Sequence, residues 1–395
     1  MAALTAAIEA AAEAALDVEL SPDCVVTRDD FGRPKSSDPT TFQRAWDTLA
    51  SADAAEHWEP DWNWMELMSL RIGRSYRLRP ASLAWAFDKL EIEDLCRRVG
   101  GESLSVPRIA AWYEGAAGDV AAVAAAVEQD RPLFVKPTHG SEAMAIETFR
   151  SPREAGLEAV LAAVERALKA EPDATEPWML RSLRHGVLVQ ELYQSEPPCE
   201  MAVPPYACPL ELKVQVLFGH VVCGSVRGFP WQLSVLPDGS LHRWPSARVT
   251  DGVGLPKEWR RSWGTAVPPE LCEALERVLA ADWKHIGRLS RAVAMEARLD
   301  EVRVDWLLGD PSLGPRIGEI QHIGAAGNVR PDLWLPLCRA FLQGHRLHAA
   351  RTAVALSSTS ATAAAAAAAV EEPAGGQRPA REEGRPDAGG AGGRA

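Results

Sequence analysis

Two stretches that lie close together in the sequence contain the residue types that bind a divalent metal ion. VRVDW contains Arg303 and Asp305, and GEIQHI contains Glu319 and Gln321. Because side chains alternate between the two faces of a β-strand, the members of each pair share a face. The segment between them, GDPSLGP (309–315), is rich in turn-forming residues and predicts a hairpin. In that hairpin Asp305 faces Glu319, and Arg303 faces Gln321.

The chemistry that this hairpin predicts is Mg²⁺ binding. Two carboxylates directly opposite on a sheet repel each other, which costs roughly 0.2–1 kcal/mol, so a cation is expected between them. Carboxylate and amide oxygens suit Mg²⁺, which is commonly held by one or two carboxylates together with phosphate oxygens of a substrate. The alternative is a solvated strand face on which Arg303 neutralises both acids. The spacing leaves both interpretations open.

A second pattern is typical of phosphate binding. FVKPTHGSEAMAI predicts a β-strand that ends near Lys136, followed by a polar turn that contains Gly140 and Ser141. Such a turn exposes backbone N–H groups to a phosphate, and the lysine adds a point charge. The sequence has neither a Walker A motif nor a GxGxxG motif after a strand. A solvated lysine at a strand end is therefore the alternative.

Two further strands carry groups that suit a nucleotide. LELKVQVLF places Glu211, Lys213 and Gln215 on one face, where the lysine can meet a phosphate or a carboxylate. VLVQELY ends in residues whose backbone groups and apolar surface suit a purine, namely Gln190, Glu191, Leu192 and Tyr193. The alternatives are an amphipathic sheet edge and an ordinary buried strand end.

The elements around these residues predict an α+β fold with antiparallel sheets. Up to about residue 125 the pattern is mainly helical, with helices predicted at 41–50, 82–99, 106–112 and 119–128. From Leu133 on, short β-type runs follow one another, and the helical stretches between them are 153–170 and 269–297. After Leu356 the sequence has no Leu, Ile, Met or aromatic residue, which predicts a disordered tail from about residue 351.

Composition excludes several classes of protein. The 395 residues include 47% hydrophobic positions, enough for a large core, and the formal net charge of -12 argues against nonspecific nucleic-acid binding. Seven scattered cysteines without a CxxC pair favour a reducing compartment. No signal peptide or membrane-spanning stretch is recognisable, so a cytoplasmic protein is expected.

Taken in order, the motifs resemble those of the ATP-grasp superfamily. They are DK (88–89), VKPTHGS, VQELY, ELKVQVLFG, RVDW and GEIQHIGAAG, and the resemblance covers roughly residues 80–330. The ELK strand and the closing RVD and GEI motifs look most like the TupA-like ATP-grasp proteins, named for teichuronopeptide biosynthesis.

The resemblance implies an ATP-grasp fold, in which two α+β subdomains with antiparallel sheets clamp ATP after a mainly helical N-terminal region. The implied ranges are 1–80 for that region, 81–130 for the N-terminal part of the ATP-grasp fold, 131–195 for the small lid subdomain, 196–350 for the large subdomain with the metal site, and 351–395 for the disordered tail.

The same resemblance implies a role for each residue of the site. Lys89 and Lys136 would contact the ATP phosphates, and Gly140 and Ser141 would belong to a flexible lid. Adenine would lie against the hinge formed by Gln190, Glu191, Leu192 and Tyr193. The catalytic residues would be Arg303, which neutralises the transferring phosphoryl group, and Lys213, which also contacts phosphate or substrate. The Mg²⁺ ligands would be Asp305, Glu319 and Gln321.

Two positions depart from the family pattern. The last metal ligand is usually Asn, and Gln321 is one methylene longer, which could shift or weaken the second metal position. The lid carries Glu142, which would bring negative charge close to the phosphates.

The implied activity is an ATP-dependent, Mg²⁺-requiring ligase that activates a carboxylate as an acyl phosphate for attack by an amine. Its partners would be ATP and a small-molecule or glycan substrate, without nucleic acid. One alternative is a phosphotransferase that passes the phosphate to a small-molecule or sugar hydroxyl. Another is a noncatalytic nucleotide-binding module.

Overall fold

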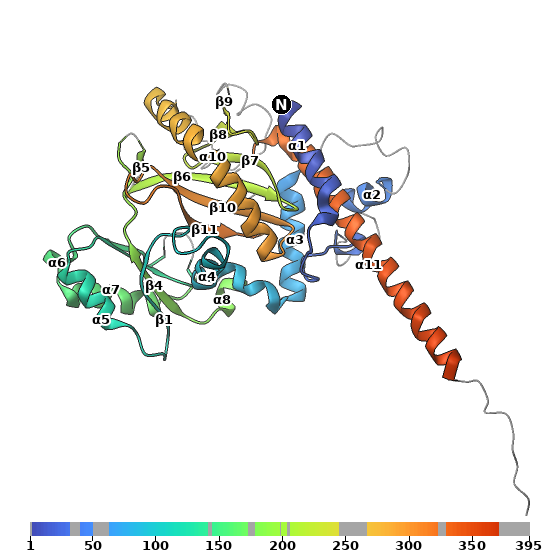
Figure 1. The fold of residues 1–395 in the computed structure, drawn as a ribbon, viewed down its shortest axis with the longest axis horizontal. Helices are drawn as coiled ribbons and strands as arrows, with labels where there is room; N and C mark the ends of the chain where they lie inside the picture. Colours follow the sequence, from blue (N-terminus) through green and yellow to red (C-terminus); the bar gives the residue numbers. More distant parts are fainter. Residues whose placement is uncertain are drawn as a thin grey trace, which may run out of the picture. The chain divides into compact units, whose positions relative to one another are not determined.

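The computed structural model describes residues 2–31, 40–49, 63–140, 144–172, 178–197, 199–203, 206–244, 267–322 and 329–370. The chain divides into two compact units, residues 1–349 and 350–395. The first unit contains both β-sheets, which are antiparallel throughout their named strands, together with the helices that cover them (Figure 1). The predicted α+β class with antiparallel sheets is therefore confirmed.

The smaller sheet has four strands in the order β1-β4-β2-β3. Their bounds are Arg108–Tyr113 for β1, Leu133–Pro137 for β2, Glu147–Phe149 for β3 and Gly186–Glu191 for β4. Its core is shared with helices α5 (Val120–Glu128) and α7 (Leu157–Leu168), and the short α6 (Pro152–Ala155) directly precedes α7. Gly156, between α6 and α7, has a φ of +85°, which a glycine adopts without strain.

One predicted helix in this region was wrong. The stretch 106–112 contains strand β1, in which Trp112 pairs with Val187 and Ala111 pairs with Leu188 of β4. Ala-rich and aromatic residues fit either element locally, and the pairing with β4 decides for the strand. Strand β1 of the segment 81–130 therefore belongs to the same sheet as the strands of 131–195, and α5 packs against that sheet.

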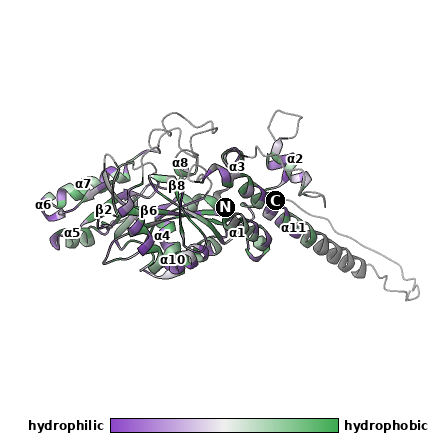
Figure 2. Ribbon diagram, turned by 90° about the horizontal axis from the view of Figure 1, so that it is seen from above, coloured by the Kyte–Doolittle hydropathy of each residue, from purple (hydrophilic) through white to green (hydrophobic). Residues whose placement is uncertain are grey.

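The larger sheet has seven strands, in the order β11-β10-β6-β7-β8-β9, with β5 also pairing with β6. The bounds are Glu200–Val203 for β5, Tyr206–Leu217 for β6, His220–Val226 for β7, Phe229–Val235 for β8, Leu241–Arg243 for β9, Glu301–Leu308 for β10 and Arg316–Gln321 for β11. Hydrophobic residues gather in the middle of this sheet, near β6 (Figure 2).

One face of this sheet is apolar and covered by helices. Val302, Val304 and Trp306 of β10 are fully buried in a core shared with the helices α10 (Pro269–Ala297) and α4 (Lys89–Gly100). The bounds of α10 are those predicted from the sequence. The Trp306 Nε1–H donates to Ser290 Oγ of α10 at 2.9 Å. Because the side chains of β10 alternate, its polar residues must occupy the opposite face.

The N-terminal region is helical, as predicted. It contains α1 (Ala2–Glu13), α2 (Thr41–Thr48) and α3 (Trp64–Leu78), and short 3₁₀ turns at Ala14–Asp17, Arg28–Phe31 and Ala81–Phe87. Thr40 caps α2 in a capping box with Gln43, and Asn63 caps α3. These helices share a core with the start of α11, where Trp64 packs edge-on against Phe341.

The final helix corrects the predicted disorder. Helix α11 runs from Trp334 to Val370, after a 3₁₀ turn at Pro331–Leu333, whereas the sequence predicted a disordered segment from 351. The composition cannot build a core, but alanine has the highest helix propensity, so the run up to residue 369 favours a helix. Residues 371–395 of the predicted tail lie outside the described residues.

Candidate functional site

The hairpin predicted around residue 312 is present with the predicted register. In the β10–β11 pair, Asp305 lies opposite Glu319 and Arg303 lies opposite Gln321. The turn between the strands is closed by Asp310, whose Oδ1 accepts from the backbone N–H groups of Ser312 and Leu313 at 2.9 and 3.0 Å. The two predicted carboxylates and the amide therefore belong to neighbouring positions of one sheet.

Strand β6 adds its own polar row on the other side of β10. Lys213 lies opposite Asp305, and Gln215 lies opposite Arg303. The Arg303 guanidinium binds the Asp305 carboxylate through two bonds, of 2.6 and 2.5 Å, and Lys213 Nζ donates to Asp305 Oδ2 at 3.0 Å. Asp305 is 2% exposed, so this carboxylate is desolvated and held by two cations of the chain.

The smaller sheet delivers Lys136 to this site. Lys136 is buried in β2, and its Nζ lies 3.5 Å from the carbonyl oxygen of Gly318 in β11. Burial, reinforced by the charge of Lys89, lowers the pKa of Lys136 to about 8, although Glu319 and Glu93 act in the opposite direction. Lys136 therefore loses its charge at a lower pH than an ordinary lysine.

Lys89 reaches the same place from the start of α4. Asp88 caps this helix by accepting from Leu90 N–H at 2.9 Å, and Lys89 N–H donates to the Thr138 carbonyl at 3.0 Å. The Lys89 ammonium donates to the Gly140 carbonyl and lies 3.8 Å from Glu319 Oε1. The two lysines expected at the phosphates thus converge on β11.

Of the predicted lid, the structure describes Gly140 but not Ser141. Gly140 is buried, and a side chain there would approach Pro137 Cγ to within 2.6 Å, so the position requires a glycine. Ser141 and Glu142 lie outside the described residues.

The predicted hinge is bonded within the protein. Gln190 Nε2 donates to the Val106 carbonyl at 3.2 Å, Glu191 forms an ion pair with Arg131, and the Leu192 N–H donates to the Pro132 carbonyl at 2.8 Å. The Tyr193 hydroxyl donates to the Gly314 carbonyl at 2.9 Å and accepts from the Asp310 N–H at 3.2 Å.

Tyr193 therefore connects the end of β4 to the turn of the β10–β11 hairpin. Its side chain is buried, which raises the pKa of the hydroxyl.

Glu211 is a site residue that the sequence did not single out, although the alternation in LELKVQVLF placed it on the same face as Lys213. Its carboxylate forms ion pairs with Lys213 and, at 2.8 Å, with Arg227 Nη1. Burial would raise the pKa of Glu211, but these two cations outweigh it and lower the pKa to about 2. Glu211 is therefore a permanent negative charge beside Asp305.

A second buried charged cluster lies at the start of β10. Asp300 binds Arg71 of α3 through bonds of 2.7 and 2.8 Å and His345 Nε2 of α11 at 2.8 Å. Ligand atoms of Asp300, Cys24 and His322 lie within 4.8 Å of one another. The Asp300 oxygens are bonded to Arg71 and His345, so the charge of Asp300 is balanced within the protein, as the charge of Asp305 is by Arg303 and Lys213. The members of this second cluster come from distant parts of the chain, and no local sequence pattern indicates it.

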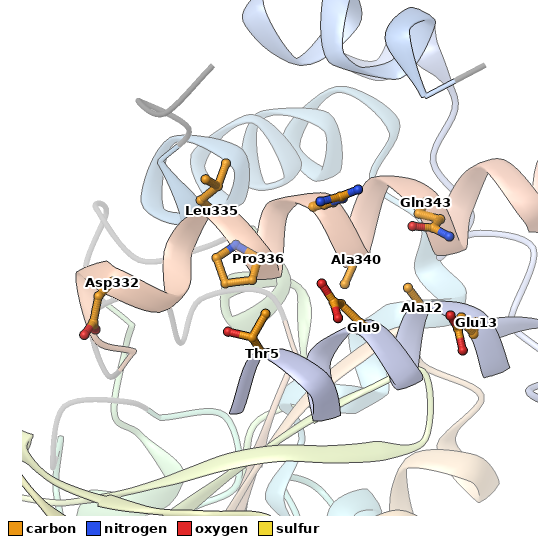
Figure 3. A pocket seen from close by; sticks show the side chains of 10 residues that line it. Thr5, Glu9, Ala12, Glu13, Asp332, Leu335, Pro336, Ala340 and Gln343 are labelled. Carbon is orange, nitrogen blue, oxygen red and sulfur yellow. The ribbon is translucent and has the colours of Figure 1, made fainter. Parts of the chain in front are cut away.

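A pocket of about 390 Å³ lies apart from these residues, between α1 and the start of α11 (Figure 3). Glu9 and Glu13 line it from α1, and Pro336 and Gln343 line it from α11 (Figure 3). Its lining contains none of the predicted site residues. Among the described residues, no helix combines the length and apolar character needed to span a membrane.

No protein family matches the sequence, and no curated protein matches it. Solved structures with a similar arrangement include the D-alanine–D-alanine ligase from Coxiella burnetii, at 12% identity and a TM-score of 0.40, covering 70% of this chain and 63% of that one. This chain thus spans less than two thirds of that ligase.

Two further similar structures are those of a synthetase and of a ligase. The D-cycloserine synthetase DcsG is 17% identical over 78% of this chain and 93% of that one, with a TM-score of 0.38. The ATP-grasp ligase PsnB, solved with a phosphomimetic variant of its minimal precursor, Mg and ADP, is 15% identical over 71% of this chain and 68% of that one, with a TM-score of 0.34.

Proposed function

We propose that this protein is an ATP-grasp ligase that uses ATP and Mg²⁺ to join a carboxylate to an amine. The observation that carries the proposal is the convergence of two sheets on one polar site. Asp305 and Glu319 share the β10–β11 hairpin of the larger sheet, and the ammonium of Lys136, from β2 of the smaller sheet, lies 3.5 Å from the Gly318 carbonyl oxygen of β11. Lys89, at the start of α4, lies 3.8 Å from Glu319. Such a combination of carboxylates and cations from two subdomains suits a nucleoside triphosphate with its metal.

The donor set fits Mg²⁺. Asp305 and Glu319 are carboxylates at directly opposed positions, and Gln321 adds an amide oxygen on the same strand as Glu319. These hard oxygen ligands are of the kind that Mg²⁺ prefers, with substrate phosphates completing the shell. When bound, Mg²⁺ would neutralise phosphate charge and thereby favour phosphoryl transfer.

The cations of the chain would bind and stabilise the phosphates. Lys136 and Lys89 are proposed to hold the phosphates from the side of the smaller sheet. Arg303 and Lys213 are proposed as the catalytic residues, because negative charge on the transferring phosphoryl group grows during transfer and preorganised cations stabilise it. Arg303 is buried and the Lys213 side chain is only 12% exposed, which strengthens this effect because water is largely excluded.

The reaction needs no nucleophilic side chain of the protein. A carboxylate oxygen of the substrate would attack the γ-phosphorus of ATP, and ADP would leave. The amine would then attack the acyl carbon, lose a proton and expel phosphate. A lid that contains Gly140 and Ser141 would keep water from the activated acyl group. The hinge of Gln190, Glu191, Leu192 and Tyr193 is proposed to contact adenine.

The finer identity is also a proposal. The strand ELKVQVLFG and the motifs RVDW and GEIQ favour the TupA-like group of ATP-grasp proteins, with a small-molecule or glycan substrate. Buried thiols such as Cys96 and Cys272 fit a cytoplasmic protein.

Product analysis tests this function. The purified chain is incubated with ATP, Mg²⁺ and panels of acids and amines that first raise its melting temperature. Formation of ADP, free phosphate and a new amide in equal amounts is expected. A phosphorylated acceptor without free phosphate would instead identify a phosphotransferase. No Mg²⁺-dependent ADP formation with any acceptor would contradict both activities and favour a nucleotide-binding module.

A further inference from the structure

Each carboxylate of the candidate metal site is paired with a lysine of the chain itself. Lys213 Nζ lies 3.0 Å from Asp305 Oδ2, and Lys89 Nζ lies 3.8 Å from Glu319 Oε1. Arg303 binds Asp305 as well. A divalent cation that approaches these carboxylates without a nucleotide therefore meets positive charges that repel it.

Lys213 has a second partner within reach. Glu211 forms an ion pair with Lys213 on one side and with Arg227 on the other, and its side chain is 10% exposed. Glu211 and Asp305 thus share one ammonium group. Lys213 can release Asp305 and still keep a buried counter-ion, which avoids leaving its charge unpaired.

We propose that Lys213 and Lys89 are internal counter-ions of the metal site, and that Glu211 is a positioning residue that retains Lys213 when Asp305 binds a metal. Divalent metal then binds the site only together with a nucleotide, because the phosphates replace Asp305 and Glu319 as partners of the two lysines. This inference rests on the proposed function and extends it to the order in which the ligands bind.

The inference predicts that removal of a lysine creates metal binding that the natural chain lacks. Mn²⁺ is titrated into the full chain without nucleotide, and free Mn²⁺ is measured by electron paramagnetic resonance. Lys213→Met is expected to bind Mn²⁺ at least about tenfold more tightly than the natural chain, since one buried positive charge is removed beside Asp305. Lys89→Met is expected to give a smaller gain, because Lys89 is farther from its carboxylate.

A matched control separates this local effect from total charge. Arg243 pairs with Glu276 at 3.2 Å, and both side chains are 52% exposed. Arg243→Met removes the same charge and is expected to leave the Mn²⁺ affinity unchanged. Thermal melts of each variant confirm that the compared chains are folded.

The role of Glu211 is tested in the opposite direction. In Glu211→Gln, Lys213 keeps Asp305 as its only ionised partner, so Mn²⁺ binding in the presence of saturating ADP is expected to weaken severalfold. Glu211→Asp is expected to restore it, because the carboxylate is retained. Restoration by the carboxylate alone distinguishes positioning of Lys213 from a general packing role.

The outcomes distinguish the inference from the function on which it rests. Tight Mn²⁺ binding by the natural chain without nucleotide, or no gain in Lys213→Met over Arg243→Met, would overturn the counter-ion inference. Asp305→Asn is measured with Mn²⁺ and ADP in the same way. If that variant binds both as the natural chain does, the metal assignment itself fails, and the proposed function fails with it.

Discussion

Two buried aspartates lie five positions apart: Asp300 directly precedes β10, and Asp305 lies within it. They occupy different environments. Asp300 is fully buried and is bonded to Arg71 and His345, which come from helices α3 and α11. Asp305 is also buried and bonded to two cations, but it lies opposite Glu319, whose side chain is 36% exposed. The same residue type therefore anchors helices at one position and lies opposite an accessible carboxylate at the other. The exposure of the neighbouring carboxylate, and not the burial of the aspartate, makes the difference.

The largest expected effect is on turnover, at Asp305 and the carboxylate opposite it. Asp305→Asn, or Glu319→Gln, is expected to lower ATP turnover by at least about a thousandfold, because each removes a charged ligand from the proposed site of phosphoryl transfer. The measurement is ADP release with the acid and amine substrates, and circular dichroism checks the fold. Unchanged ADP release in both variants would contradict the proposed metal site, and with it the contrast drawn between Asp305 and Asp300.

At the anchoring aspartate the expected effect is on stability. Arg71→Met leaves Asp300 buried without its main cation, which is expected to lower the free energy of unfolding by about 3–5 kcal/mol. Denaturant unfolding of the variant beside Asp305→Asn checks this. If Asp305→Asn proved the more destabilising of the two, the distinction between anchor and site would be wrong.

The ionisation of Lys136 gives a third test, because stability and ATP affinity are expected to change in opposite directions as the pH rises. Its pKa is about 8 in the folded chain, below the usual lysine value, so the unfolded chain binds more protons above pH 8. The unliganded protein should therefore gain stability as pH rises through and above 8, by at most about 1.4 kcal/mol per pH unit. Affinity for ATP should fall over the same range, because the ammonium proposed to bind phosphate loses its charge.

Lys136→Ala is the reference for that experiment. The variant is expected to bind ATP about tenfold or more weakly at pH 7, and its stability profile should lack the contribution above pH 8. Calorimetric titration gives the affinity, and unfolding at several pH values gives the stability. Equal affinity in the variant and the natural chain would contradict the phosphate role of Lys136.

The smallest effect is expected at the link between hinge and hairpin. Tyr193→Phe removes the hydroxyl that bonds Gly314 and Asp310, which is expected to cost about 1–2 kcal/mol of stability. A modest loss of ATP affinity should accompany it, because the hairpin turn is then less firmly held. A thermal shift with and without ATP measures both, and an unchanged melting temperature would show that the link is not stabilising.

Much of the site was predictable because it depends on local periodicity. The alternation in VRVDW and GEIQ, with turn-forming residues between them, placed Asp305 opposite Glu319, and the pairing has that register. Alternation in LELKVQVLF likewise grouped Glu211 with Lys213, but nothing local indicated that the two would share an ion pair. The stretch 106–112 was predicted as a helix, because its strand partner, β4, lies more than seventy residues later.

What the sequence alone determined is therefore the set of polar faces and the class of chemistry that they suit. Period-two alternation, turn residues and residue type act over a few positions, so they can be read along the chain. The tertiary structure decided which cations those carboxylates meet, because Lys89, Lys136 and Lys213 reach β10 and β11 from separate elements. It also decided that Asp300 is an anchor, since Arg71 and His345 approach it from helices far away in the sequence. Electrostatic interactions depend on distance in space and on burial, and neither is encoded by spacing along the chain.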